Sequence, residues 1–450
     1  MPTAQLPDTA APVVSTSPTL AERAAADGVR FLLATFVDLV GKPCSKLVPV
    51  ESVEMLQTEG VGFAGYAAGL FGQTPADPDV IVLPDPDSYT PLPFVRPGLA
   101  LVHCDPTVNG APWPFAPRVI LRAVLDRLAA AGYTAQAGGE AEYFLVGRDD
   151  DGRIVPADRL DVSSSPCYDA RSLTRMYDHL TEVSQALNAL GWCNYANDHE
   201  DGNGQFEQNF RHADPLTTAD RLITFRYLVH VLAERRGMTA TFMPKPFTHS
   251  TGTGLHLHLS LWDGPTPLFP ADVDPRGLGL SPLAYRFVAG LLEHAPALQA
   301  VLGPTVNSYK RTAPAAGAHG PSWAPHTVTY GGNDRTHLLR IPEGNRVEVR
   351  AGDGAANPYL ALAALLAAGL DGVERELDPG DPPNGPGIGV PPTLLHAAQA
   401  LTGDAVVRGA LDAAGGADVS GYYAAAKREE FLTWHSQVTA AEIDQYLTAF

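Results

Sequence analysis

Cysteine is scarce in this chain, and its few cysteines are not arranged for metal binding or for a disulfide framework. Four cysteines occur among 450 residues, at Cys44, Cys104, Cys167 and Cys193. None belongs to a CxxC pair, which argues against a zinc site and against a small disulfide-stapled fold. We therefore expect the protein to work in a reducing environment, such as the cytoplasm.

Basic charge and long hydrophobic runs are also lacking. The 31 Lys and Arg residues stand against 50 Asp and Glu, which gives a formal net charge of -19. Because nucleic-acid affinity comes mainly from basic side chains that neutralise phosphates, we expect no nucleic-acid partner. The longest strongly apolar run, Tyr359 to Leu370, is shorter than the roughly 20 residues that span a bilayer. It predicts a buried helix and no membrane role.

The hydrophobic content is high enough for a large core and for more than one domain. It amounts to 45%, with 18% charged residues. We expect a flexible tail at residues 1–23, a small sheet-rich domain at 24–112 and a larger domain at 113–450. The small domain is marked by short β-rich runs between Pro/Gly turns, at Val29–Val37, Cys44–Val50, Val80–Leu83 and Leu99–Cys104.

The larger domain contains several helix signals. Pro117 suits the first turn of a helix that opens this domain. Further helices are expected at Ser172–Leu190, at Thr218–Arg236, and at Pro358–Ala368 behind an Asn357 cap. The Pro/Gly-rich stretch Asp378–Pro392 predicts a surface loop.

Four segments of the larger domain have the pattern of strands with polar groups on one face. These polar groups are Glu140 and Glu142; Gln205 and Glu207, with Glu200 upstream; His256, His258 and Ser260; and Arg346, Glu348 and Arg350. Each pattern taken alone is most simply a solvated strand face. Taken together they indicate converging carboxylates, which stay ionised in a poorly hydrated site only when cations compensate them.

The residue types indicate which cations and which reaction. Carboxylate oxygens with a single imidazole suit Mg²⁺ or Mn²⁺, whereas a catalytic zinc site more often uses several His or Cys ligands. Arginine forks match phosphate and carboxylate groups. Arginine-rich strands beside a metal cluster therefore predict phosphoryl transfer onto an acidic substrate.

The chain resembles glutamine synthetase from about Val29 to the C-terminus. The matching motifs, in family order, are Phe242-Met243-Pro244-Lys245-Pro246, Gly252-Thr253-Gly254-Leu255-His256-Leu257-His258, Asn307-Ser308-Tyr309-Lys310-Arg311, Arg346-Val347-Glu348-Val349-Arg350 and Ala356-Asn357-Pro358-Tyr359. The resemblance implies an α+β fold, in which an N-terminal β-grasp domain precedes a catalytic domain with a curved antiparallel sheet and flanking helices. It also implies a homo-oligomer, a dodecamer, with active sites between subunits.

The same resemblance implies a role for each matching residue. Glu142, Glu200 and Glu207 resemble ligands of a first Mg²⁺ or Mn²⁺ ion, and Glu140, His256 and Glu348 those of a second. His258, Ser260, Arg335, Arg340 and Arg346 resemble the residues that bind ATP. Arg311, Arg350 and Gly252 resemble the L-glutamate site, Tyr168 resembles an amine-site tyrosine, and Arg335, Arg350 and Glu207 are the implied catalytic residues.

Two acids of the family pattern are missing where the amine would bind. The family loop Phe-Asp-Gly-Ser-Ser appears here as Phe63-Ala64-Gly65-Tyr66-Ala67, so Ala64 replaces an aspartate. Trp323 replaces a flap glutamate, and no Asp or Glu occurs between Arg311 and Asp334. An apolar pocket favours an alkyl group over a hydrated ammonium ion. The pattern resembles the γ-glutamylmethylamide synthetases, and we expect the amine substrate to be a small alkylamine.

Two alternatives stay open at this point. One is ordinary glutamine synthesis from ammonia, since Glu207 or a water molecule could accept the proton. The other is a non-catalytic regulator that binds glutamate or a nucleotide, which the presence of all six expected metal ligands argues against. Release of phosphate from ATP only when glutamate and an amine are both present would separate an enzyme from a regulator.

Overall fold

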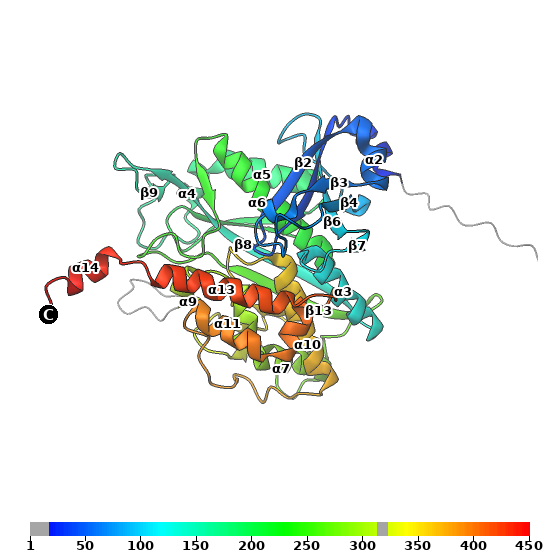
Figure 1. Ribbon diagram of the computed structural model, residues 1–450. Helices are drawn as coiled ribbons and strands as arrows, with labels where there is room; N and C mark the ends of the chain where they lie inside the picture. The colour runs from blue at the N-terminus through cyan, green and yellow to red at the C-terminus, as the bar shows by residue number, and fades with distance from the viewer. Residues whose placement is uncertain (1–17, 313–322) are drawn as a thin grey trace, which may run out of the picture.

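The computed structural model describes residues 18–312 and 323–450, which form two sheets and the helices around them (Figure 1). The smaller sheet has seven strands in the order β2-β1-β6-β4-β3, with β5 and β7 paired to β6. Its strands are β1 (Phe31–Val37), β2 (Pro43–Pro49), β3 (Val61–Phe63), β4 (Val80–Pro84), β5 (Thr90–Pro91), β6 (Leu99–Val108) and β7 (Ala111–Pro112). All four runs predicted as strands form β1, β2, β4 and β6.

The expected flexible tail ends earlier than predicted. Helix α1 (Leu20–Ala26) begins inside the segment 1–23, because Thr19 and Glu22 form a capping box at its start. Leu20 is fully buried against the small sheet together with Leu56 of α2 (Val53–Thr58). The prediction for residues 20–23 was therefore wrong, and residues 1–17 lie outside the described part of the chain.

The larger sheet has ten strands in the order β10-β11-β8-β13-β17-β16-β15, with β9 and β12 paired to β8 and β14 paired to β13. Its strands are β8 (Thr134–Arg148), β9 (Ile154–Pro156), β10 (Asn194–His199), β11 (Gln205–Phe210), β12 (Thr239–Thr241), β13 (Leu255–Asp263), β14 (Thr266–Pro267), β15 (Tyr330–Gly331), β16 (Leu339–Arg340) and β17 (Val347–Val349). The four leucines of β13 at alternating positions 255–261 are buried in the main core. Its polar residues face the other way, as the period of two predicts.

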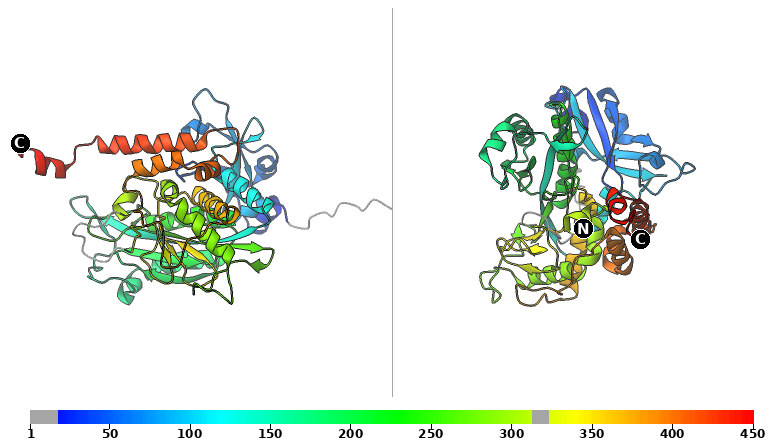
Figure 2. Two further views of the ribbon diagram at one scale, coloured as in Figure 1. Left: turned by 90° about the horizontal axis from the view of Figure 1, so that it is seen from below. Right: turned by 90° about the vertical axis from the view of Figure 1, so that its left-hand side faces the viewer.

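Helices surround this sheet, and most of them contribute buried side chains to the core on its leucine-lined side (Figure 2). They are α3 (Pro117–Ala130), α4 (Ala170–Arg175), α5 (Tyr177–Ala189), α6 (Pro215–Glu234), α7 (Pro282–Glu293), α8 (Ala295–Leu302), α9 (Ser308–Thr312), α10 (Pro358–Glu374), α11 (Leu394–Gly403), α12 (Ala405–Leu411), α13 (Val419–His435) and α14 (Ala440–Tyr446). In the described part of the chain, none of them combines the length and the apolar character that crossing a membrane requires.

The helix signals in the sequence correctly predicted the starts of α3 and α10, but they placed some helix ends wrongly. Helix α3 begins at Pro117, and the Asn357 side chain accepts a hydrogen bond from the Tyr359 amide at 3.1 Å to cap α10. The stretch Ser172–Leu190 was predicted as one helix but divides into α4 and α5 at Met176, whose ψ of 10° interrupts the helical path. Helix α10 runs six residues past the predicted end at Ala368, to Glu374, because packing on α3 and α7 extends it.

An ion network around the buried Arg118 joins the small sheet to helices α3 and α6. Arg118 on α3 donates to Asp220 on α6 at 2.9 Å, to Asp105 on β6 at 2.8 Å and to Asp85 after β4 at 2.6 Å. The Arg118 side chain is only 4% exposed. Removing one partner of a buried charge group leaves the others uncompensated, which destabilises far more than losing a surface ion pair.

We predict that Arg118→Met lowers the free energy of unfolding by about 3–5 kcal/mol, because the buried Asp220 loses its paired cation and Asp85 and Asp105 keep only Arg122. Urea denaturation followed by circular dichroism measures the change. The matched control is Arg127→Met on the same helix, whose exposed pair with Glu374 is 3.4 Å long and should contribute about 0–1 kcal/mol. Equal destabilisation by the two substitutions would contradict the importance of the network.

Candidate active site

Strand register brings the predicted polar residues into one row across the larger sheet. Glu207 on β11 lies opposite Glu142 on β8. Strand β13 pairs with the other edge of β8, and there His256 lies opposite Glu140. Glu348 on β17 then lies opposite His258. Since neighbouring strands are about 5 Å apart, residues that are distant in sequence meet on one face of the sheet.

One end of this row forms a group that could hold a single cation. His256 Nδ1 is 3.6 Å from Glu140 Oε2 and 3.9 Å from Glu348 Oε1. One ligand atom from each of these three residues lies within 4.8 Å of the others. They are the three residues that the family resemblance implies as ligands of the second metal.

The other end of the row holds two overlapping groups. Glu142, Glu207 and His256 form one, and Asp198, Glu200 and Glu207 form the other. The implied first-metal set of Glu142, Glu200 and Glu207 therefore spans both groups, which share Glu207. Asp198 was not singled out from the sequence, although it lies opposite Glu207 in the β10–β11 pairing. Its sequence signal was an acid two positions before Glu200, on the same strand face.

Within residues 18–312 and 323–450, no Lys or Arg pairs with Glu200 or Glu207 at this end of the row. Burial, followed by the charges of Glu140, Glu200 and Glu142, raises the pKa of Glu207 well above its usual range. Burial and the charges of Glu142, Asp198 and Asp201 raise the pKa of Glu200 to about 8. A divalent cation would supply the missing charge, and oxygen ligands with one imidazole fit Mg²⁺ or Mn²⁺.

At the opposite end of the row, positively charged side chains of the protein balance the negative charge of the carboxylates. Burial acts to raise the pKa of Glu348, but His256, His258, Arg350 and Arg340 lower it below its usual range. Arg340 Nη1 lies 2.6 Å from one Glu348 oxygen, and Arg350 Nη1 lies 2.5 Å from the other. Arg340, which is predicted to bind ATP, and Arg350, which is predicted to bind the γ-carboxylate of glutamate, thus both lie directly beside the predicted metal ligand Glu348.

The remaining predicted ATP residues surround this end. Arg346 Nε donates to His258 Nδ1 at 3.2 Å. The backbone carbonyl of the exposed Arg335 accepts a hydrogen bond from Arg350 Nε at 3.0 Å. Ser260 is buried, and its Oγ accepts from Trp262 Nε1 at 2.9 Å. The Ser260 hydroxyl is therefore already engaged by a neighbour on its own strand.

The predicted glutamate clamp, Arg311, is buried behind the carboxylate row. Its guanidinium donates to the carbonyl of Ala351 at 3.3 Å and to that of Arg350 at 3.2 Å. A Cβ on Gly252 would lie 2.8 Å from Arg311 Cγ, so glycine is needed there for packing against the clamp itself.

Gly254 has a role that the sequence analysis did not single out. A Cβ at this position would lie 2.8 Å from both Glu142 Oε1 and His256 Nε2. Its amide donates to Glu142 Oε2 at 2.7 Å, and Gln205 Nε2 donates to the same oxygen at 2.7 Å. Glycine therefore keeps the space among the predicted ligands open. The signal was its place two residues before His256, at the start of the same strand.

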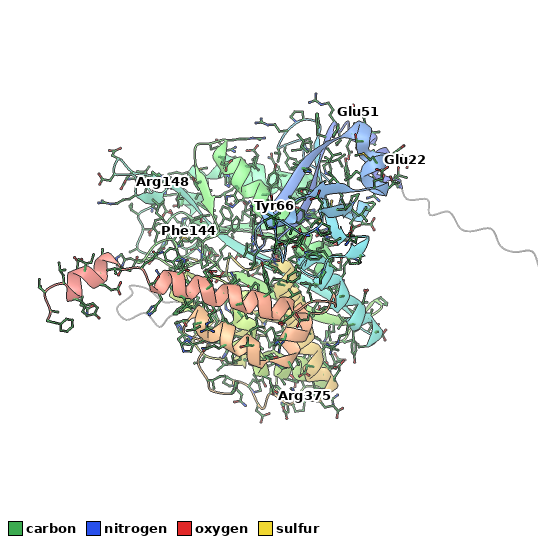
Figure 3. All side chains as sticks on the ribbon, in the orientation of Figure 1. Glu22, Glu51, Tyr66, Phe144, Arg148 and Arg375 are labelled. Atoms are coloured by element: carbon green, nitrogen blue, oxygen red, sulfur yellow. The ribbon has the colours of Figure 1, made fainter. Side chains whose placement is uncertain are left out.

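The three predicted amine-site residues come from different parts of the fold. Tyr168 is 67% exposed, and its amide donates to the His199 carbonyl at 2.9 Å. The Trp323 indole donates to Asp201, the residue after Glu200. The structure thus brings Tyr168 and Trp323 to the same turn. Ala64 is exposed on the loop after β3, beside the labelled Tyr66 in Figure 3.

Comparison with known proteins agrees with this geometry. Residues 114–446 match the family model described as glutamine synthetase, catalytic domain. A glutamate–methylamine ligase of Methyloversatilis universalis is 41% identical over 436 residues, covering 94% of this chain and 97% of the relative. A glutamine synthetase of Rhizobium leguminosarum bv. phaseoli is 39% identical over 436 residues, covering 93% and 97%.

Solved structures give the same result for the fold. A GmaS/ADP complex in conformation 1 superposes with a TM-score of 0.89 at 44% identity, covering 95% of this chain and 99% of the other. An apo GmaS structure superposes with a TM-score of 0.87 at 43% identity, covering 96% and 99%. The expected α+β glutamine synthetase fold is confirmed, and the chain belongs to the glutamine synthetase family.

Proposed function

We propose that this chain is an ATP-dependent ligase that joins a small alkylamine to the γ-carboxylate of L-glutamate through γ-glutamyl phosphate. The observation that carries the proposal is the row of five carboxylates and one imidazole, with arginines at one end and an uncompensated acidic cluster at the other. The similarity to a glutamate–methylamine ligase favours an alkylamine. The similarity to glutamine synthetases leaves ammonia as the second candidate.

In this proposal the row holds two divalent cations. Glu140, His256 and Glu348 would bind one, and Glu142, Glu200 and Glu207 the other. When bound, Mg²⁺ or Mn²⁺ neutralises charge that develops on the transferring phosphoryl group. The hydrogen bonds from Gln205 and Gly254 orient Glu142 before any cation arrives.

The arginines would hold the two anionic substrates. Arg311 would bind the α-carboxylate of glutamate. Arg350 lies next to Glu348 and would hold the γ-carboxylate close to the phosphoryl group, which Arg335, Arg340 and Arg346 would bind with His258 and Ser260. Fixing both reactants in this way makes the second step effectively unimolecular, which can lower the barrier by several kcal/mol.

The amine would enter at the acidic end of the row. Glu207 is the proposed proton acceptor, because its carboxylate lies at this end of the row, opposite Glu142 and Asp198. Trp323 and Tyr168 flank the turn that carries Glu200, and Ala64 of a neighbouring subunit would complete the pocket. Each of these supplies apolar surface where a glutamine synthetase would place an acid or bind ammonium.

We predict that Glu142→Ala and Glu348→Ala each lower turnover by more than about 100-fold, because even partners of metal ligands change affinity or activity by about 10–100-fold. EDTA should stop turnover reversibly. The assay is phosphate release with saturating Mg²⁺, and Mn²⁺ binding followed by thermal shift gives a readout besides activity. Glu374→Ala, on an exposed pair far from the row, is the matched control. Near-normal activity of either ligand variant would show that the cluster is wrongly assigned.

We predict a higher kcat/KM for methylamine or ethylamine than for ammonium. A desolvated methyl contact changes such ratios by only about 10–200-fold, so ammonium should be a weak substrate. Restoring acids with the double substitution Ala64→Asp and Trp323→Glu should lower the use of alkylamines.

Steady-state kinetics with ammonium, methylamine, ethylamine, ethanolamine and a diamine measures this preference. The single substitutions serve as controls, since each restores one acid only. If the wild-type protein prefers ammonium to every amine in the panel, the alkylamine proposal is wrong and the enzyme is an ordinary glutamine synthetase.

We further propose a closed homo-oligomer, a dodecamer of two stacked hexameric rings, with active sites shared between subunits. Two features support it: Ala64 is exposed on its own chain, and the C-terminal end of α13 extends from the fold together with α14 (Figures 1 and 2). This extension carries exposed apolar side chains, at Leu432, Trp434, Val438, Ile443, Tyr446, Leu447 and Phe450. Such an apolar surface favours burial against another copy.

The prediction is a single large species of about twelve subunits by mass photometry. Truncation after His435 should dissociate it, because the apolar arm is then lost. A fully active monomer would contradict the shared-site proposal.

A further inference from the structure

Trp323 is tied to the carboxylate cluster by a single directional contact. Its indole N–H donates to the Asp201 carboxylate, while the ring is 43% exposed. A hydrogen bond to an ionised acceptor is about twice as strong as a neutral one. Because Asp201 directly follows Glu200, this contact places the ring beside the proposed amine end of the row.

The turn that carries Asp201 is held firmly from behind. Asp161 accepts hydrogen bonds from His199 Nε2 at 2.7 Å, from Asn203 Nδ2 at 2.9 Å and from the Gly204 amide at 2.5 Å. The side chains of Asp161 and His199 are fully buried. Asp161 therefore anchors both sides of the turn between β10 and β11.

Packing fixes the middle of the same turn. The Gly202 amide donates to Gln205 Oε1 at 3.0 Å. A Cβ on Gly202 would lie only 2.7 Å from the Phe144 ring, which Figure 3 labels on β8. Gln205 also donates to Glu142, so the turn is connected to the carboxylate row as well as to the core. Asp201 thus projects from a rigid support and accepts the hydrogen bond of the Trp323 indole.

We propose that Asp201 is a positioning residue for amine selectivity: it holds the Trp323 ring beside Glu200, where the ring covers the alkyl group of the amine. This inference rests on the proposed function. An untethered indole could rotate away and admit water, which would favour the hydrated ammonium ion over an alkylamine. A fixed ring excludes that water and offers a methyl group an apolar contact.

The test compares the kcat/KM of methylamine with that of ammonium in Asp201→Ala, Asp201→Asn, Trp323→Phe and the double variant Asp201→Ala/Trp323→Phe. Asp201→Ala should lower the methylamine-to-ammonium ratio by about tenfold, which is the effect of losing one hydrogen bond to a charged group. Asp201→Asn should keep most of the ratio, because an amide oxygen still accepts from the indole. The double variant should be no lower than the single ones, because both substitutions break the same bond.

The ratio distinguishes positioning from a general effect on the site. Damage to metal binding or folding would change both amines alike and leave the ratio unchanged. Asp151→Ala, in the exposed turn before β9, is the matched control and should leave the ratio at its wild-type value. Trp323→Phe breaks the bond from the other side, so it keeps the test decisive if Asp201→Ala fails to fold.

Two results would overturn the inference in different ways. A wild-type preference for methylamine that survives both Asp201→Ala and Trp323→Phe would show that Asp201 does not set selectivity, and the proposed function would stand. A wild-type preference for ammonium would remove the proposed function itself, and with it the need for a positioned ring.

Discussion

The constraint on which the rest of the structure depends is the crowding of carboxylates on one face of a buried sheet. Such groups remain ionised together only if positive charge balances them. The chain supplies that charge at one end, where two histidines and two arginines surround Glu140 and Glu348. At the other end, no Lys or Arg among the described residues pairs with Glu200 or Glu207, and the pKa values of both are raised. That asymmetry makes one end suited to anionic phosphates and the other to a cation and an amine.

The surrounding fold holds this row in place against its own repulsion. The buried leucines of β13 keep His256 and His258 on the open face, and Gly254 leaves room between two ligands. Arg118 ties the small sheet to the helices behind the row through three aspartates. A rigid scaffold of this kind lets like charges stay close, because moving one of them apart would disturb packed core on the other face of the sheet.

In the proposed function, amine selectivity depends on weaker and more local contacts than metal binding does. Trp323 reaches the site through a hydrogen bond to Asp201, whereas five of the six predicted metal ligands sit on strands with fixed register and only Glu200 lies on a turn. Residues on loops change more readily than residues on strands, since a loop can vary without disturbing the core.

The sequence by itself determined the family, the polar row and the strands that carry it, because the alternation of polar and apolar residues in β8, β13 and β17 indicates which residues share a face. It also placed the start of α3 at Pro117 and the cap of α10 at Asn357, since both signals are local. It did not give the break at Met176, the helix at Leu20, the place of Asp198 beside Glu207 or the contact of Trp323 with Asp201. Asp198 meets Glu207 through the register of β10 on β11, and Trp323 meets Asp201 from 122 positions away, so tertiary structure decided both. The helix at Leu20 has a local capping box, but the burial of Leu20 against the small sheet is a tertiary contact.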